Sequence, residues 1–303
     1  MSTENNRLGA RSYQPQYKEL LQAVFKHEAY FRDFFGGEIE ALDGVQHNEN
    51  AFYVKTSDIP VVVRGYDTDA DTAMGSGTAN STRFGERTEI IYQDTPVPYT
   101  WDWAYHEGID RHTVNNNLDA AVADRLELQA QAKVDEFNAH HSEFISENAG
   151  ETLELISLDA DGVLALFNEL SVYFTNQRTI GARVANVAPQ IFNIIVDHPA
   201  TTIEKRSSAN IDDNTIVKFK GFEIQELPED AFQEGEVIYA YVKNVGKAFT
   251  GINTARTIES EDFDGVALQG AGKAGEFILD DNKVAVVKVE GNLDGDEGNG
   301  VEG

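Results

Sequence analysis

One stretch of the sequence decides the fold: residues 117–150, NLDAAVADRLELQAQAKVDEFNAHHSEFISENAG. Apolar residues recur in it every three or four positions, and the region from 109 to 149 contains neither Gly nor Pro. This pattern is typical of an amphipathic helix, with Asn117 as its N-cap and Gly150 as its stop. A helix of about 30 residues would be ~45 Å long, well above the usual length. We therefore predict a strut in a mixed chain rather than a member of a helical bundle.

Before this helix, residues 64–87 read RGYDTDADTAMGSGTANSTRFGER and contain few large apolar residues. Such a segment cannot bury a core of its own, and long loops of this kind are usually functional. The flanks on both sides have the composition of strands. The sequence therefore predicts one long hairpin with a flexible tip.

The returning side of this hairpin carries aromatic residues at alternate positions: Tyr99, Trp101, Trp103 and Tyr105. A period of two places all four rings on one face of a strand. Such a face is either a stacking platform for a sugar or nucleobase, or a face packed against the body of the protein. We favour the packed face, because both Trp residues of the chain lie here, beside a loop that needs anchoring.

The N-terminal region is polar as far as residue 16 and then follows a helical period that ends at Gly36 and Gly37. Its apolar positions form one stripe: Tyr17, Leu20, Leu21, Val24, Phe31, Phe34 and Phe35. A stripe of this size needs a partner surface to cover it.

Beyond Gly150, helical and strand-like stretches alternate, which predicts an α/β region. Helices are expected after Asp159 or Asp161 and from Pro189. Strands are expected at 183–188, 216–227, 237–242, 266–269, 277–279 and 284–289. The glycines of Gly270-Ala-Gly272-Lys-Ala-Gly275 would form a hairpin turn between two of these strands.

The charge, the cysteine count and the lengths of the apolar runs exclude several classes of protein. The 303 residues include 52 Asp+Glu against 24 Lys+Arg, which gives a net charge of −28. This balance argues against sequence-specific DNA binding, because clustered Lys and Arg are needed to neutralise phosphates. The absence of Cys excludes disulfides, Cys-ligated zinc and thiol catalysis. No apolar run reaches the ~20 residues of a membrane span and no secretory signal is recognisable, so we predict a soluble, cytosolic protein.

No motif for catalysis or cofactor binding has the context that it needs. The G-x-G-x-x-G run at 270–275 lacks the following helix that a dinucleotide site requires. Asp67, Asp69 and Asp71 have the first spacings of a calcium loop, but the Gly and Glu that should follow are both Thr. We therefore expect no enzyme activity, no metal site and no cofactor; for the three aspartates a solvated loop is favoured, and weak binding of a divalent cation stays open as the alternative.

The order of the segments resembles that of the major capsid protein of tailed, siphovirus-like bacteriophages with the Hong Kong 97-type fold. Two stretches also resemble strands of that family: GEFILDDNKVAVVKV at 275–289 and Gly221-Phe222-Glu223-Ile224. The resemblance covers nearly the whole chain. It implies an α+β fold with an N-terminal arm, an extended E-loop hairpin, a long spine helix in a peripheral domain, and an α/β axial domain.

The resemblance also implies where these parts begin and end. They are an N-terminal arm with an amphipathic helix at 1–50, the E-loop and its flanking strands at 51–105, a peripheral domain at 106–150 plus 276–290, an axial domain at 151–275, and a mobile acidic tail at 291–303. The first helix is then expected to dock on a neighbouring copy and not on its own subunit. The residues expected to contact neighbouring copies are Leu21, Val24, Phe31, Arg83, Arg87, Trp101 and Trp103.

The function implied is structural: hexamers and pentamers of an icosahedral shell that encloses packaged phage DNA. The partners implied are further copies of the chain, a portal protein, and decoration or head-completion proteins, with non-specific contact to DNA and none to a membrane. A separate scaffolding protein is expected, because only residues 1–16 precede the first helix. The location implied is the virion, after assembly in the host cytoplasm. The founding phage cross-links a loop Lys to a neighbouring subunit, but residues 61–105 contain no Lys, so we expect a shell held non-covalently.

Two other functions stay open at this point. An encapsulin-like nanocompartment shell would share the fold and enclose an enzyme, which neighbouring genes would reveal. A carbohydrate-binding module would use the face of Trp101 and Trp103, and would be a soluble monomer with saturable sugar binding.

Overall fold

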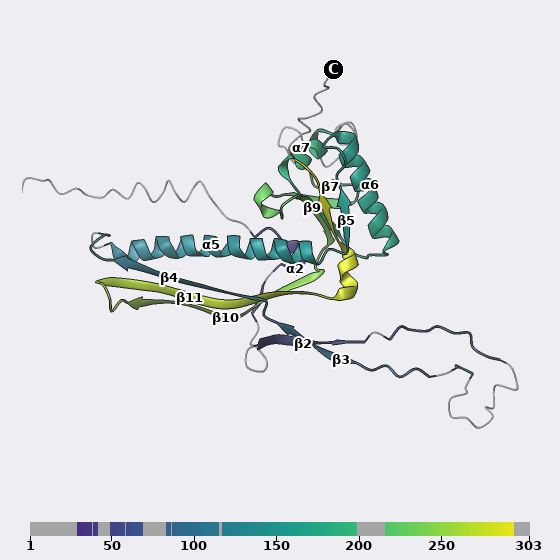
Figure 1. Ribbon diagram of the computed structural model, residues 1–303, viewed down its shortest axis with the longest axis horizontal. Coiled ribbons are helices and arrows are strands. Elements are labelled where there is room, and N and C mark those ends of the chain that lie inside the picture. Colours follow the sequence, from purple (N-terminus) through teal and green to yellow (C-terminus); the bar gives the residue numbers. More distant parts are fainter. Residues whose placement is uncertain are drawn as a thin grey trace, which may run out of the picture.

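The computed structural model describes residues 29–37, 39–41, 49–57, 59–68, 83–85, 87–114, 117–198 and 216–293. Within these ranges the strands form a six-stranded sheet, a four-stranded sheet and a two-stranded hairpin. Figure 1 shows the six-stranded sheet at one end of helix α5 (Leu118–Glu147), the four-stranded sheet alongside that helix, and the hairpin projecting away from both. No helix in the described ranges has the length and apolar character needed to cross a membrane.

The six-stranded sheet mixes parallel and antiparallel pairs. Its strands lie in the order β5 (Glu151–Glu154), β12 (Val286–Glu290), β9 (Glu236–Val242), β6 (Arg183–Val187), β8 (Phe222–Glu226) and β7 (Lys218–Phe219). Helices α6 (Ala160–Asn176) and α7 (Pro189–Asp197) cover one face, with Phe167, Phe174 and Ile195 in the shared core. The expected helix starts are confirmed, because the carboxylate of Asp159 accepts the Gly162 N–H at 2.7 Å and Pro189 is the first residue of α7.

The other face of this sheet is covered by the C-terminal part of α5 and by the short helix α2 (Arg32–Phe35). Tyr239 and Tyr241 of β9 are fully buried there. They contact rings from the N-terminal region: Phe31 lies 6.1 Å from Tyr239 and Phe34 lies 5.0 Å from Tyr241, centroid to centroid. The sheet is therefore a central layer with helices on both sides.

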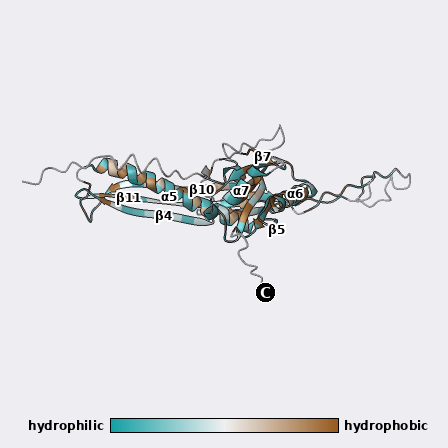
Figure 2. Ribbon diagram, turned by 90° about the horizontal axis from the view of Figure 1, so that it is seen from above, coloured by the Kyte–Doolittle hydropathy of each residue, from teal (hydrophilic) through white to brown (hydrophobic). Residues whose placement is uncertain are grey.

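Helix α5 confirms the long helix expected from the sequence, since it has 30 residues. Asn117 occupies the N-cap position, but its side chain makes no capping hydrogen bond. Its buried side chains are Gln129, Phe137, Asn138, His141, Ser142 and Ile145. Figure 2 shows hydrophilic and hydrophobic residues mixed along its length, as expected for a strut with one covered side. The expected stop at Gly150 is wrong, because α5 ends at Glu147 with Asn148 as its C-cap. Gly150 is required instead by a close approach, because a Cβ there would lie 2.5 Å from the carbonyl oxygen of Lys283.

The four-stranded sheet runs beside α5 in the order β1 (Glu40–Ala41), β10 (Gly246–Glu259), β11 (Gly265–Ile278) and β4 (Trp101–Asp110). Strand β11 continues without a break through the glycine-rich run at 270–275. The expected hairpin turn at these glycines is therefore wrong, and the turn lies instead between β10 and β11.

The strand pairing also corrects the expected division of the chain. Strands β10 and β11, which were expected in the axial region at 151–275, pair with β1 and β4 in the sheet beside α5. Strand β12, which was expected with the spine helix at 276–290, lies inside the six-stranded sheet between β5 and β9. The chain thus leaves the six-stranded sheet after β9 and returns to it as β12.

The expected hairpin is confirmed at its base, where β2 (Asn50–Thr56) pairs antiparallel with β3 (Gln93–Pro98). The part of its expected flexible tip at 69–82 lies outside the described residues. The same holds for residues 1–28, which include most of the expected first helix, and for the tail from 294.

Candidate assembly surfaces

The first candidate surface is the hairpin extension, which we define as residues 59–68, 83–85 and 87–92. Its large apolar side chains are exposed: Val61, Val62, Val63, Tyr66, Phe84, Ile90, Ile91 and Tyr92. Val61 and Val63 are 86% and 90% exposed, so they contribute almost nothing to the core of the subunit. Large apolar side chains exposed together in one segment are typical of an interaction surface.

The two sides of the hairpin extension touch near its far end. The rings of Tyr66 and Phe84 meet edge to face at 5.2 Å, and the Asp67 N–H donates to the carbonyl oxygen of Arg83 at 3.0 Å. The guanidinium group of Arg83 lies 6.0 Å from the Tyr66 ring centroid, and Arg87 is exposed. Both arginines therefore sit on this extension, beside its exposed apolar side chains.

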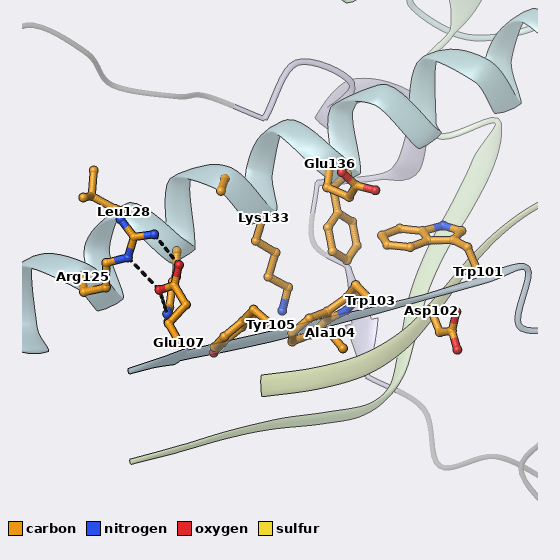
Figure 3. A pocket seen from close by; sticks show the side chains of 13 residues that line it. Trp101, Asp102, Trp103, Ala104, Tyr105, Glu107, Arg125, Leu128, Lys133 and Glu136 are labelled. Carbon is orange, nitrogen blue, oxygen red and sulfur yellow. Dashed lines mark hydrogen bonds and ion pairs between the residues drawn. The ribbon is translucent and has the colours of Figure 1, made fainter. Parts of the chain in front are cut away.

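The second candidate surface is the aromatic face of β4, which is directed at α5 (Figure 3). Trp101 stacks on His140 at 4.1 Å with an interplanar angle of 14°. Trp103 lies parallel to Tyr105 at 5.8 Å, and the Lys133 ammonium lies 4.0 Å from the Trp103 centroid. Burial lowers the pKa of Lys133 below its usual value. The packed face expected from the alternating aromatics is therefore confirmed for Trp101, Trp103 and Tyr105. Tyr99 precedes β4 and contacts Phe249 instead, and β4 pairs with β11 rather than with the outgoing side of the hairpin.

Small residues on β11 make room for these rings. Gly270 pairs with Tyr105 and Gly272 pairs with Trp103 across the β4–β11 ladder. A Cβ at Gly270 would overlap the Tyr105 ring. The glycine run that resembles a phosphate-binding motif thus serves as a platform for aromatic side chains from the neighbouring strand.

A groove of about 600 Å³ lies between the middle of α5 and β4. An ion pair closes it at one end: Arg125 Nε donates to Glu107 Oε2 at 2.6 Å, and the Gln129 side chain donates to the same oxygen (Figure 3). The hydrogen bonds from Arg125, followed by those from Gln129, lower the pKa of Glu107 to about 2 despite partial burial. The pair joins helix and strand across the groove.

A buried carboxylate, Glu276 of β11, lies where the hairpin joins β4. It is 6% exposed and accepts hydrogen bonds from Thr100 Oγ1 at 3.1 Å and from Trp101 Nε1 at 3.1 Å. His141 Nε2 approaches Glu276 Oε1 to 3.5 Å. Burial raises the pKa of Glu276, and burial together with His140 lowers the pKa of His141 to about 3. His141 is therefore neutral near neutral pH.

Glu276 was not among the residues predicted from the sequence, although the sequence contains a signal for it. It is an acidic residue in an apolar strand, at a position that alternates with Ala274 and Ile278 on the buried face. A carboxylate on such a face must be bound by several donors, because an unpaired buried charge is very costly.

A second polar cluster joins the C-terminal end of α5 to the six-stranded sheet. Glu236 accepts from Lys288 Nζ at 2.8 Å, from Ser146 Oγ at 2.6 Å and from Tyr239 Oη at 2.6 Å. Lys288 also lies 3.3 Å from Ser146 Oγ. These contacts tie the C-terminal end of α5 to strands β9 and β12. The cluster is therefore a structural joint.

The contacts expected at the N-terminal region need one correction. Phe31 is 1% exposed and packs against Tyr239 of its own subunit, so its side chain is not available to a neighbouring copy. An apolar stripe shows that a partner surface is needed, and here residues 31–35 find that surface within the subunit. Leu21 and Val24 lie outside the described residues.

Trp101 and Trp103 likewise contact α5 of their own subunit. Of the expected contact residues within the described ranges, only Arg83 and Arg87 lie on the hairpin extension. The described residues contain no group of three or more acidic or His side chains placed to hold a metal ion. Asp69 and Asp71 lie outside those residues.

Comparison with solved structures identifies the fold. The capsid of the cyanophage P-SCSP1u superposes with a TM-score of 0.65 at 9% identity, over 89% of this chain and 90% of that one. The mature capsid of bacteriophage PhiM1 gives 0.65 at 10% identity over 89% of each chain, and a structure of Mycobacterium phage Che8 gives 0.64 at 14% identity over 88% and 92%. No protein-family model and no curated protein matches the sequence. The chain therefore has the fold of phage capsid structures.

Proposed function

We propose that the chain is the major capsid protein of a tailed bacteriophage and forms the hexamers and pentamers of an icosahedral shell around packaged DNA. The observation that carries the proposal is the fold shared with phage capsids over 89% of the chain. The hairpin extension supports it, because its apolar side chains are exposed in a single subunit and would be covered by a neighbouring copy.

Contacts made on assembly would offset the conformational-entropy cost of ordering the projecting hairpin. Ordering a segment costs conformational entropy, and a lone subunit gains little from the hairpin extension in return. A neighbour that binds it shifts the equilibrium toward the ordered form. The net charge of −28 opposes close association and adhesion to DNA alike, so subunit contacts should be apolar or locally complementary.

The partners in this proposal are other copies of the chain, a separate scaffolding protein, a portal protein, and decoration or head-completion proteins. The shell would form in the host cytoplasm and end in the virion, with non-specific contact to DNA. A nanocompartment shell would instead accompany a gene for a cargo enzyme. A sugar platform needs open ring faces, whereas Trp101 is stacked on His140 and Trp103 is covered by Lys133.

The first expected result concerns assembly itself. The chain expressed with the structural genes beside it should form particles of megadalton mass in size-exclusion chromatography with light scattering, and closed shells in negative-stain images. A strict monomer at every protein and salt concentration would contradict the proposal. Particles that copurify with an enzyme instead of phage components would favour the nanocompartment.

The second expected result concerns the arginines of the hairpin extension. Arg83→Glu combined with Arg87→Glu should lower particle yield several-fold and make the yield more sensitive to salt. Guanidinium groups form bidentate pairs with carboxylates, and an acidic neighbour offers many of these. One exposed pair is worth only ~0.2–1 kcal/mol, but a closed shell repeats it in every subunit.

The matched control is Arg178→Glu combined with Lys220→Glu, which changes the charge equally at exposed positions after α6 and between β7 and β8. This control should assemble nearly normally, and both double variants should keep the melting temperature of the subunit. Equal yields for the two double variants at low and high ionic strength would show that apolar contacts alone seat the hairpin.

A further inference from the structure

Among the described residues, the hairpin is joined to the sheet beside α5 on its β3 side by a short junction. Strand β3 ends at Pro98 and β4 begins at Trp101, so Tyr99 and Thr100 form the junction between the hairpin and the sheet beside α5. A small apolar cluster of Ala51, Val97 and Phe249 is buried at the base of the hairpin. Figure 1 shows the hairpin extending from this base well beyond the rest of the described chain.

Apolar contacts at the base hold the hairpin to the sheet, but the hydrophobic effect that drives them has no directional preference of its own. Directional contacts come from hydrogen bonds at the junction. The Thr100 N–H donates to the carbonyl oxygen of Ala274 at 3.0 Å. The side chains of Thr100 and Trp101 donate to the two carboxylate oxygens of Glu276. One buried carboxylate therefore binds two consecutive residues where the junction enters β4.

We propose that Glu276 is a positioning residue, whose carboxylate fixes the direction in which the β2–β3 hairpin leaves the subunit. Its position explains why a charged group is kept in an apolar strand. An apolar side chain would bury at lower cost, but it would offer no acceptor to Thr100 or Trp101. The consequence for assembly rests on the proposed function, whereas the direction of the hairpin is a property of the single subunit.

The charge of Glu276 should matter for this role, because a carboxylate accepts from both donors more strongly than a neutral acid does. The ionisable groups that act on it lie on α5: His141 at 3.5 Å, and His140 and Glu143 through longer-range interactions. His141 stays neutral well into the acid range, so protonation of Glu276 is the change that should loosen the junction. The carboxyl is expected to protonate at a higher pH than an exposed Glu does.

The direction of the hairpin can be measured by pulsed electron spin resonance. The chain has no Cys, so Gln93→Cys on β3 and Ala130→Cys on α5 provide two exposed labelling sites. The full chain would be labelled and diluted with unlabelled chain. The distance distribution should be narrow with Glu276 and at least twofold broader in Glu276→Leu, while the melting temperature stays within a few degrees.

The matched control is Glu259→Gln, which removes a carboxylate charge from an ion pair with Arg111 at the end of the β10–β11 ribbon opposite to Glu276. It should leave the distribution unchanged. An equally narrow distribution in a folded Glu276→Leu chain would overturn the proposal. If that variant does not fold, Glu276→Gln takes its place. The distance distribution of Glu276→Gln should be broader than that of the parent chain and should not change with pH. The distribution of the parent chain should broaden as the Glu276 carboxyl protonates. If the width of the distribution is the same in Glu276→Gln and in the parent chain, and does not change with pH in the parent, the proposal would also be overturned.

The outcome is separable from that of the proposed function. A broad distribution in Glu276→Leu supports the positioning role even if the chain never forms particles. Normal particle formation together with an unchanged distribution defeats the positioning role and leaves the capsid proposal standing.

Discussion

Replacing Phe34 with Ala should lower the free energy of unfolding by about 3–5 kcal/mol, the usual cost of deleting a buried aromatic ring. Phe34 is fully buried and lies edge to face against Tyr241 at 5.0 Å and Phe35 at 4.7 Å. Gly246 has no side chain where this ring packs, since a Cβ there would overlap it. Ala would therefore leave a cavity between α2 and the central strands, and urea unfolding of the purified subunit would measure the loss.

The control is Val172→Ala, which removes an apolar group from a side chain that is 59% exposed on α6. Its effect should stay within about 0.5 kcal/mol. A loss below 1 kcal/mol for Phe34→Ala would show that α2 is only loosely attached. Such a small loss would favour the expectation that the N-terminal region docks chiefly on a neighbouring copy.

Gly270→Val should also destabilise the subunit strongly, by about 1–3 kcal/mol or more, through overpacking. The new Cβ would occupy the space of the Tyr105 ring, which would have to leave its place opposite Gly270. Val is otherwise well suited to a strand, so local propensity cannot account for a loss. Thermal or urea unfolding would again give the magnitude.

Ala271→Val is the matched control, because residue 271 is on the same strand and is exposed. It should be neutral or slightly stabilising. Adding Tyr105→Ala to Gly270→Val should recover part of the loss, since it removes the ring that the new side chain meets. Equal effects of Gly270→Val and Ala271→Val would mean that the packing of the ring does not depend on the glycine.

The features that could be predicted from the sequence are those with a local physical cause. Helix α5 follows from the spacing of its apolar residues, and α7 from Pro189 at its start. The aromatic face of β4 follows from strict alternation. In each case neighbouring residues alone determine which side of the element is covered.

The features that could not be predicted depend on contacts distant in sequence. A glycine run typically marks a turn, and only the rings of Tyr105 and Trp103 on another strand explain why it continues as β11. Phe31 shows the same limit, because its stripe required a partner but did not identify Tyr239. Glu276 was missed for the same reason, since its donors precede it by more than 170 residues.

The route of the chain between the two sheets has a mechanical consequence. The β10–β11 ribbon leaves from the end of β9 and returns to the start of β12, and these two strands are adjacent, with Tyr241 paired to Val286. Tension applied at the far end of the ribbon is therefore divided between two strands in the interior of the six-stranded sheet. Each of them is held on its outer side by a further strand, β6 for β9 and β5 for β12. The sheet would resist the load as a unit, and neither strand could be pulled out without breaking a ladder on both of its sides.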